Sequence, residues 1–327
     1  MCSLKVTFFS SYGEGFAVPR STFADKRVNP LAKYFSILEG KAFAWILLVP
    51  SLTLVSFFIV YPLYRGIRLS FSEYKLLDGK NPEFNGLDNY SILIRDPDVL
   101  NAARITFIYT VLGLISQVLL GMGAALLLTK KSKYIWIARI AIMLPWFMPP
   151  VVTAYMWRFM LDAKVGIYTL LLSHIGIDIG GVGIWGDPDR ALYGVLFVEL
   201  WRSYPFFTLF ILAGIQAIPV ELRESTALDG ANAFQHFRYI TLPLLKPVLF
   251  VSTVLEAIKL INSPTLVLLM TEGGPADSTM VLPLLAFKKA YQAFDFGYSS
   301  TISVAVLVAI SGFAIVYIRA VGFGREK

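Results

Sequence analysis

The stretch IPVELRESTALDGANAFQHFRYITLPLLKPV, residues 218–248, decides how the rest of this sequence is organised. It is the longest polar and charged interval in the second half of the chain, and long apolar stretches flank it on both sides. Pro219 suits the first position of a helix, because its φ is fixed and it has no N–H to leave unpaired. Glu221 and Glu224 fall in the first turns, where carboxylates interact favourably with the positive end of the helix dipole.

The middle of this stretch predicts a turn between two short helices. Gly230 follows a helical pattern that ends at Leu228, and glycine adopts the positive φ of a helix C-terminus without strain. Residues 231–239 predict the second helix, and Pro243 and Pro247 are expected to stop and restart the chain. We therefore expect a helical hairpin with one exposed polar face.

The composition places the chain among polytopic membrane proteins. Apolar residues make up 56% of the 327 residues and charged residues only 16%, which no soluble domain of this size requires. The net charge of +7 does not indicate nucleic-acid binding, because no basic stretch is interleaved with exposed aromatic residues. The single cysteine, Cys2, excludes an intramolecular disulfide and a CxxC metal or redox site. His174 and His236 lie too far apart in the sequence to predict a metal pair.

Six apolar runs predict an all-α integral membrane protein with six membrane-spanning helices. A helix of about 20 residues crosses a bilayer, and runs of that order lie at about 42–64, 102–128, 136–160, 191–217, 247–270 and 296–318. Pro145 and the segment 148–150 break the third run, whereas Glu256, Lys259 and Pro264 interrupt the fifth.

The six runs form one predicted domain, residues 42–320, between a polar N-terminal tail (1–41) and a short C-terminal tail (321–327). The first tail lacks the apolar core and small-residue cleavage site of a secretory signal. Gly121 and Gly123 in the second run predict that another helix approaches closely there.

The distribution of basic residues predicts the orientation. With the N-terminus inside, the inner segments carry clearly more Lys and Arg than outer loops of about the same total length. The short loop 130–133 contains three lysines and no acid. Because basic residues are retained on the cytoplasmic side, we expect both termini and the hairpin (218–246) to be cytoplasmic.

The hairpin also carries a family resemblance. Glu224, Gly230, Ile240 and the pair Leu242-Pro243 resemble, in type and spacing, the EAA---G---------I-LP motif of inner-membrane permeases in binding-protein-dependent ABC importers. Asp229-Gly230-Ala231 is similar to the DGA sequence of the sugar permeases. The two alanines after the glutamate are here Ser225 and Thr226, which are also small.

The outer loops resemble the same MalF-like sugar permeases. FNGLDNY at 84–90 is similar to their FxGLxNY segment, and TEGGP at 271–275 to their TxGGP turn. Ala293-Phe294 and Gly297-Tyr298 resemble the AF…GY sequence that begins their last span. The likeness covers about residues 42–320, with the motifs in the order of the family.

The resemblance implies a permease subunit of the ABC importer type I fold, located in the inner membrane. It implies a second homologous permease, two ATPase subunits, an extracytoplasmic solute-binding protein and a carbohydrate or polyol as solute. The chain has no GxxxxGK[ST] sequence, so ATP and Mg²⁺ are expected on the ATPases, with no cofactor, metal or catalytic residue here. The residues expected to couple to the ATPases are Glu221, Glu224, Ser225, Thr226, Asp229, Gly230, Ala231, Ile240, Leu242 and Pro243.

Polar and aromatic residues in the fourth and fifth spans predict a solute pathway. Ionisable groups inside a span are costly and usually face a polar cavity or one another. Glu256 and Lys259 have i,i+3 spacing, so pairing for structure alone carries equal weight. The pathway residues that we expect are Trp201, Tyr204, Glu256, Lys259, Asn262 and Thr265.

Two other classes of protein are possible readings of this composition. Asp96-Pro97-Asp98 and Asp187-Pro188-Asp189 lie on the outer side, and paired acids there would suit a metal-dependent integral-membrane transferase. We favour a simpler role for them, since Asp caps a helix and Pro occupies its first turn. A secondary transporter predicts inverted repeats, and the sequence shows none.

Overall fold

The computed structural model describes residues 41–130, 132–176 and 181–321 of the chain, so the predicted tails lie almost wholly outside the described residues. The chain divides into two units, residues 1–61 and 62–327. In the first unit, helix α2 (Lys41–Val55) continues into the π-helical turn η1 (Ser56–Val60). The helical run that starts there continues along the chain as α3 (Tyr61–Ser70), six residues beyond the predicted span.

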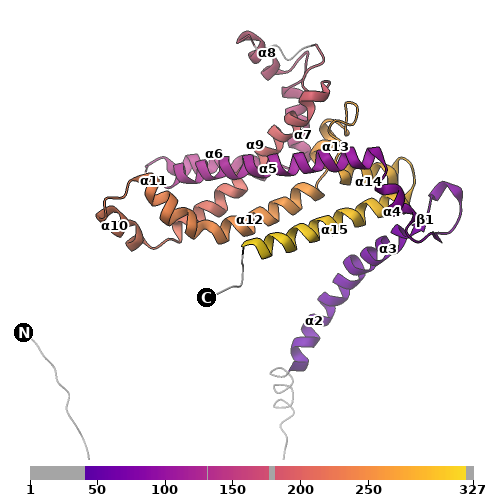
Figure 1. Cartoon of the computed structure of the whole chain (residues 1–327). Helices are drawn as coiled ribbons and strands as arrows, with labels where there is room; N and C mark the ends of the chain where they lie inside the picture. Colours follow the sequence, from indigo (N-terminus) through magenta and orange to yellow (C-terminus); the bar gives the residue numbers. More distant parts are fainter. Residues whose placement is uncertain (1–40, 131, 177–180, 322–327) are drawn as a thin grey trace, which may run out of the picture. The chain divides into compact units, whose positions relative to one another are not determined.

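The second unit is a helical bundle (Figure 1). Its long helices are α5 (Pro97–Leu128), α9 (Pro188–Gln216), α12 (Leu242–Asn262) and α15 (Phe296–Val321). Helix α6 (Ile135–Phe147) packs on α9. The shorter elements are β1 (Ser72–Glu73), η2 (Leu76–Asp78), β2 (Glu83–Phe84), α4 (Asp88–Leu93), α7 (Pro150–Met160), α8 (Ile167–His174), α10 (Val220–Leu228), α11 (Ala233–His236), η3 (Phe237–Thr241), α13 (Thr265–Met270) and α14 (Leu282–Tyr291). The two strands pair antiparallel, with Ser72 opposite Phe84.

The predicted spans correspond to helices. Four helical runs in the described part of the chain are long and apolar enough to cross a membrane: 45–70, 97–128, 188–216 and 296–319. Helices α6 and α7 make a fifth if the bent pair is one span. Helix α12 lies where the remaining span was expected, but it contains Lys246, Glu256 and Lys259 and ends at Asn262. The all-α fold class is confirmed, and the bounds of the six spans stay a prediction.

The break in the third span is confirmed. Helices α6 and α7 meet at 98° around Met148, whose ψ of 132° is extended. Residues before a proline are disfavoured in the helical region, and here Pro149 and Pro150 follow in succession. Two consecutive prolines therefore turn the chain sharply.

The prediction that Pro243 and Pro247 stop the chain is wrong. Both lie in α12, which follows directly from the π-helical turn η3. The Leu242 N–H donates to the carbonyl of Phe237, five residues back. Pro243, which has no N–H to donate, follows directly after this change from i−4 to i−5 bonding. The helix therefore continues past Pro243 because of the wider π-helical turn. Pro247 lies inside α12.

The α5–α9 contact depends on Gly121. A Cβ at Gly121 would lie 2.5 Å from the Cβ of Phe207 and 3.1 Å from the backbone nitrogen of Thr208, both on α9. A Cβ at Gly123 would meet nothing within 4 Å. The predicted close approach is therefore confirmed at Gly121, and not at Gly123.

We expect Gly121→Val to separate α5 from α9, because overpacking a tight contact costs about 1–3 kcal/mol. The melting temperature of the purified full chain in lipid nanodiscs should fall clearly. Gly123→Val adds the same side chain two residues away and is the matched control. Equal melting temperatures for the two variants would contradict this description of the contact.

Candidate functional site

The end of α10 and the turn after it are built as the sequence predicts, whereas the predicted second helix (231–239) begins at Ala233 and continues through η3 into α12. Helix α10 ends at Leu228, and Gly230 has a φ of +74°. The N–H of Ala231 donates to the carbonyl of Thr226 (3.0 Å) across that residue, which is the six-to-one bond of a Schellman turn. The hydrogen bond and the left-handed glycine fix the direction in which the chain leaves α10.

A capping box opens the second helix of the hairpin. The N–H of Gln235 donates to the side chain of Asn232 (2.9 Å), and the N–H of Asn232 donates to the side chain of Gln235 (2.9 Å). We did not predict this cap, although the Asn-x-x-Gln spacing is visible in the sequence. The turn is therefore held on both sides, by the end of α10 and by the start of α11.

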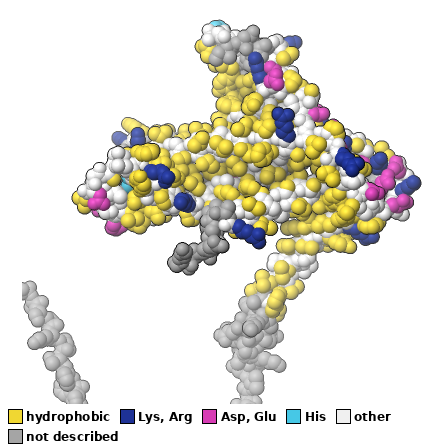
Figure 2. All heavy atoms as spheres, viewed as in Figure 1, with side chains coloured by type: hydrophobic (Ala, Val, Ile, Leu, Met, Phe, Trp, Pro, Cys, Tyr) yellow, Lys and Arg dark blue, Asp and Glu magenta, His cyan; other side chains and the backbone are white. Residues whose placement is uncertain are grey.

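The hairpin presents an exposed surface at one end of the bundle (Figure 1). Glu221, Glu224, Ser225, Asp229 and Gly230 are exposed, and Figure 2 shows acidic side chains at that end. Large apolar side chains are exposed beside them, with Leu228 at 89% and Phe234 at 73%. A surface that is both acidic and apolar suits contact with another protein.

The remaining predicted coupling residues lie closer to the bundle. Thr226 is partly buried and donates its hydroxyl proton to the carbonyl of Leu222 (3.0 Å). Partial burial is shared by Ala231, Ile240, Leu242 and Pro243. These side chains are less accessible than the acidic residues of the hairpin, which are exposed.

A buried ionic cluster joins α9 to α12. The Lys259 ammonium donates to Glu256 (2.7 Å), Glu199 (3.0 Å) and the Ser203 hydroxyl (2.6 Å). Ser203 also donates to Glu199 (2.6 Å). The Glu199 and Glu256 side chains are almost completely buried, and about a third of the Lys259 side chain is exposed. The predicted Glu256–Lys259 pairing is confirmed.

The expected pathway did not include Glu199 or Ser203, which supply half of this cluster. Glu199 and Ser203 lie four residues apart on α9, so one helix face presents both. That spacing was visible, but nothing local shows which face of α9 meets α12. Arg202 lies beside them, and its buried Nε has no hydrogen-bond partner among the described residues.

The other predicted pathway residues do not form one continuous site by any described contact. Trp201 is partly buried and packs edge-on against Trp157, with 5.4 Å between ring centroids. Tyr204 is partly buried one turn further along α9. Asn262 is exposed at the end of α12 and donates to the carbonyl of Ile258, and Thr265 begins α13 after the break.

Trp201 lines an aromatic cavity. The cavity has a volume of about 780 Å³ and lies between α7, α8 and α9. Trp157 stacks on Tyr168 (5.5 Å) and meets Phe197 edge-on (5.1 Å), and all three rings line the cavity together with Tyr193. This aromatic site was not predicted, because its walls come from three separate elements.

Two of the motifs expected in the outer loops meet in space. A Cβ at Gly297 would collide with the backbone of Ser72, so this glycine lets α15 reach strand β1. The Asn89 side chain of the FNGLDNY motif donates to the carbonyl of Ser72 (2.9 Å). In the TEGGP turn, Thr271 and Thr279 share a hydrogen bond of 2.7 Å between their hydroxyls. The FNGLDNY and GY motifs thus meet at strand β1, whereas the TEGGP turn is held by its own hydrogen bond.

The Asp-Pro-Asp sequences are helix caps, as favoured. Asp96 accepts the N–H of Asp98 (2.9 Å) at the start of α5, and Asp187 accepts the N–H of Asp189 (2.9 Å) at the start of α9. Asp96 also accepts the hydroxyl proton of Tyr298 (2.6 Å). In the described part of the chain, no three His, Cys, Asp or Glu side chains lie together as a metal site would require.

Comparison with known protein families identifies the family of this chain. Residues 117–322, which include the whole hairpin, match the family described as binding-protein-dependent transport system inner membrane component. The chain belongs to this family. Its members are permeases of ABC importers, and the chain is therefore a membrane-embedded transport protein.

Relatives in this permease family align over most of the chain. It is 32% identical to the trehalose/maltose transport system permease protein MalF of Thermococcus litoralis, over 91% of this chain and 99% of that protein. It is 29% identical to the sulfoquinovosyl glycerol transport system permease protein SmoG of Agrobacterium fabrum, over 86% of this chain and 91% of the relative.

A solved structure confirms the permease fold. A chain of a bacterial ABC transporter involved in the import of the acidic polysaccharide alginate aligns with a TM-score of 0.78. The alignment covers 90% of this chain and 100% of that chain at 19% identity. The expected type I importer fold is thus confirmed at the level of architecture.

We expect Lys259→Met to destabilise this permease, because Glu199 and Glu256 would then lie buried together without a counter-charge. Breaking a buried pair costs about 3–5 kcal/mol, and we expect less because Lys259 is about a third exposed. The apparent melting temperature of the purified chain should fall, and adding Glu199→Gln and Glu256→Gln should restore most of it.

Lys246→Met on the same helix is the control, since Lys246 is exposed. It should leave the melting temperature unchanged. If Lys259→Met behaves like this control, the cluster contributes nothing measurable to stability.

Proposed function

We propose that the chain is one of two homologous permease subunits that together form the pathway of an ABC importer for a carbohydrate or related polyol. ATP is hydrolysed by two separate ATPase subunits, and an extracytoplasmic binding protein delivers the solute. The names of the two relatives support a carbohydrate, as does the alginate importer that shares the fold. In this proposal the permease itself performs no catalytic step.

The exposed hairpin is the observation that carries the proposal. Its turn is fixed by the left-handed Gly230 and by the capping box of Asn232 and Gln235. A rigid element transmits displacement, and exposed apolar residues such as Leu228 gain free energy when a partner covers them. We assign the ATPase contact to this surface.

The orientation follows from the basic residues at the same end of the bundle. Figure 1 shows the hairpin helices α10 and α11 at the same end of the bundle as the connection between α5 and α6. That connection includes Lys130 and Lys133, and basic residues favour the cytoplasmic side. We therefore propose that the hairpin and the chain termini face the cytoplasm, where ATP is available.

The solute pathway is proposed along α9 and α12. Pockets for small molecules combine aromatic walls with a few well-placed polar groups. Trp201 supplies an aromatic wall, and the Lys259 cluster supplies hydrogen-bonding groups inside the membrane domain. Tyr204, Asn262 and Thr265 extend this polar and aromatic lining in the proposal. The transferase alternative has no support, since the outer acids serve as helix caps.

We expect Gly230→Leu to reach the membrane normally and fail to transport. Apart from its two chain neighbours, no described residue has an atom within 4 Å of an added Cβ, so the side chain would project from the docking surface. The left-handed φ adds about 1 kcal/mol of strain for any L-residue, which leaves the bundle folded. Uptake of labelled sugar and ATP hydrolysis should be measured on the reconstituted importer.

Gly230→Ala is the matched control, because it introduces the same backbone strain with little bulk. It should retain part of the transport activity, and Glu224→Lys should impair coupling by reversing a charge at the contact. Wild-type uptake by Gly230→Leu would sink the assignment of the ATPase contact to the hairpin.

We expect Trp201→Ala to reduce uptake or to change which sugars compete, by at least about tenfold in apparent affinity, as for a buried aromatic contact. Assembly with the ATPase subunits should be unchanged, as judged by co-purification. Trp136→Ala, at an exposed tryptophan of α6, is the control. Identical competition profiles for the two variants would place the solute contacts elsewhere.

A further inference from the structure

We propose that Lys133 and Arg139, at the start of α6, bind the phosphate group of an anionic phospholipid, and that an adjoining groove on α6 holds one of its acyl chains. The inference requires only that the chain lies in a membrane. It does not depend on the solute or on the ATPase contact. Two hollows that share one arginine carry it.

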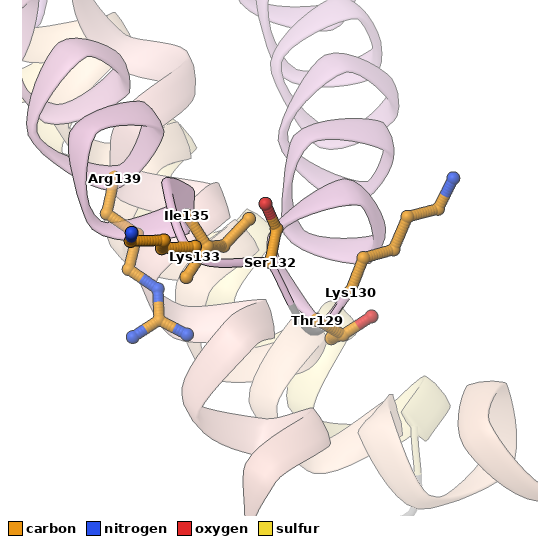
Figure 3. A pocket seen from close by; sticks show the side chains of 6 residues that line it. All are labelled: Thr129, Lys130, Ser132, Lys133, Ile135 and Arg139. Carbon is orange, nitrogen blue, oxygen red and sulfur yellow. The ribbon is translucent and has the colours of Figure 1, made fainter.

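The first hollow is basic. It has a volume of about 570 Å³ and is lined by three cationic residues, two hydroxyl residues and one isoleucine: Thr129, Lys130, Ser132, Lys133, Ile135 and Arg139. None of these lining residues is acidic. Figure 3 shows Lys133 and Arg139 extending to the same side of the turn, whereas Lys130 extends to the other side. Lys133 and Arg139 are therefore placed to hold one anion between them.

Some other basic residues of the membrane domain are neutralised by carboxylates. Lys259 and Lys289 lie in ion pairs with carboxylates. Among the described residues, no carboxylate pairs with Lys133 or Arg139, and both are exposed. One guanidinium nitrogen of Arg139 donates a long hydrogen bond to the carbonyl of Leu128 (3.5 Å), at the end of α5. That bond keeps the guanidinium beside the turn, and its planar N–H groups match a phosphate.

The second hollow is apolar and begins at the same arginine. It has a volume of about 390 Å³ and is lined by Arg139, Ile140, Met143, Leu144 and Phe147. Ile140, Leu144 and Phe147 recur at helical spacing on one face of α6 and are 58%, 56% and 74% exposed. The groove thus leads from the basic turn along the helix.

The combination indicates a lipid in preference to a soluble anion. A free phosphate would use only Lys133 and Arg139 and would leave the groove exposed. In a phospholipid the acyl chains are covalently linked to the phosphate. The two hollows are adjacent in the same way, because Arg139 lines both of them. Basic pockets at helix ends on one side of a membrane have the chemistry that holds anionic headgroups.

The test is native mass spectrometry of the purified full chain, titrated with phosphatidylglycerol or with phosphatidylcholine of the same acyl chains. The wild type should retain phosphatidylglycerol with an apparent Kd at least about tenfold lower, given the contribution of two basic residues near a headgroup. Lys133→Gln combined with Arg139→Gln should abolish that difference. Arg319→Gln is the control, since it removes an exposed cation of α15 that lines neither hollow.

Three outcomes would overturn the proposal. The wild type shows no preference for phosphatidylglycerol, which would leave the basic turn to a protein partner. The double variant retains the preference, or Arg319→Gln loses it equally, which would indicate general surface charge. Glycerophosphoglycerol, the headgroup without acyl chains, displaces the lipid at equal concentration, which would reduce the site to a free-anion site.

Discussion

The close contact between α5 and α9 is the constraint on which the rest of the bundle depends. It is the most extensive contact between helices in the described residues, and it exists because Gly121 has no side chain to hold Phe207 away. In lipid, helices gain little from hydrophobic burial against one another, so close packing of backbones contributes much of the association free energy. Helix α9 is thereby fixed, and α6 and α12 pack on it.

The ionic cluster is the second interaction that holds α9 in place, and it connects α9 to α12. A lysine in a membrane domain is costly unless it is paired, and Lys259 is satisfied by two carboxylates and a hydroxyl from two helices. The pairing offsets the desolvation of the charges only while α9 and α12 stay in this register. The cluster therefore specifies which faces of the two helices meet, and Trp201 lies between Glu199 and Ser203 on the same turn of α9.

The hairpin is connected directly to both of these helices. It follows α9 through the short segment after Gln216, and it continues without interruption into α12 through the π-helical turn η3. A movement of the hairpin is therefore transmitted to α12 along a continuous helix. The same continuity links the surface proposed for the ATPases to the helix that carries Glu256 and Lys259, which gives a physical route from hydrolysis to the proposed pathway.

The sequence by itself determined the features that depend on local backbone chemistry. Apolar runs predicted the helices of the membrane domain, Asp-Pro-Asp predicted two helix caps, and consecutive prolines predicted the break after α6. Gly230 predicted a left-handed turn. Each follows from the dihedral preferences or hydrogen-bonding groups of a few adjacent residues, so the sequence contains the whole interaction.

Only the tertiary structure decided which distant groups meet. Glu199 and Lys259 form an ion pair although sixty residues separate them in the sequence. The walls of the aromatic cavity come from three elements. Gly297 packs against the backbone of Ser72, although the two residues are far apart in the sequence. Even the passage of the helix through Pro243 depended on a π-helical turn that no local preference predicted. These features depend on helix faces and crossing points, which are set by packing across the bundle and leave no mark in any single stretch of sequence.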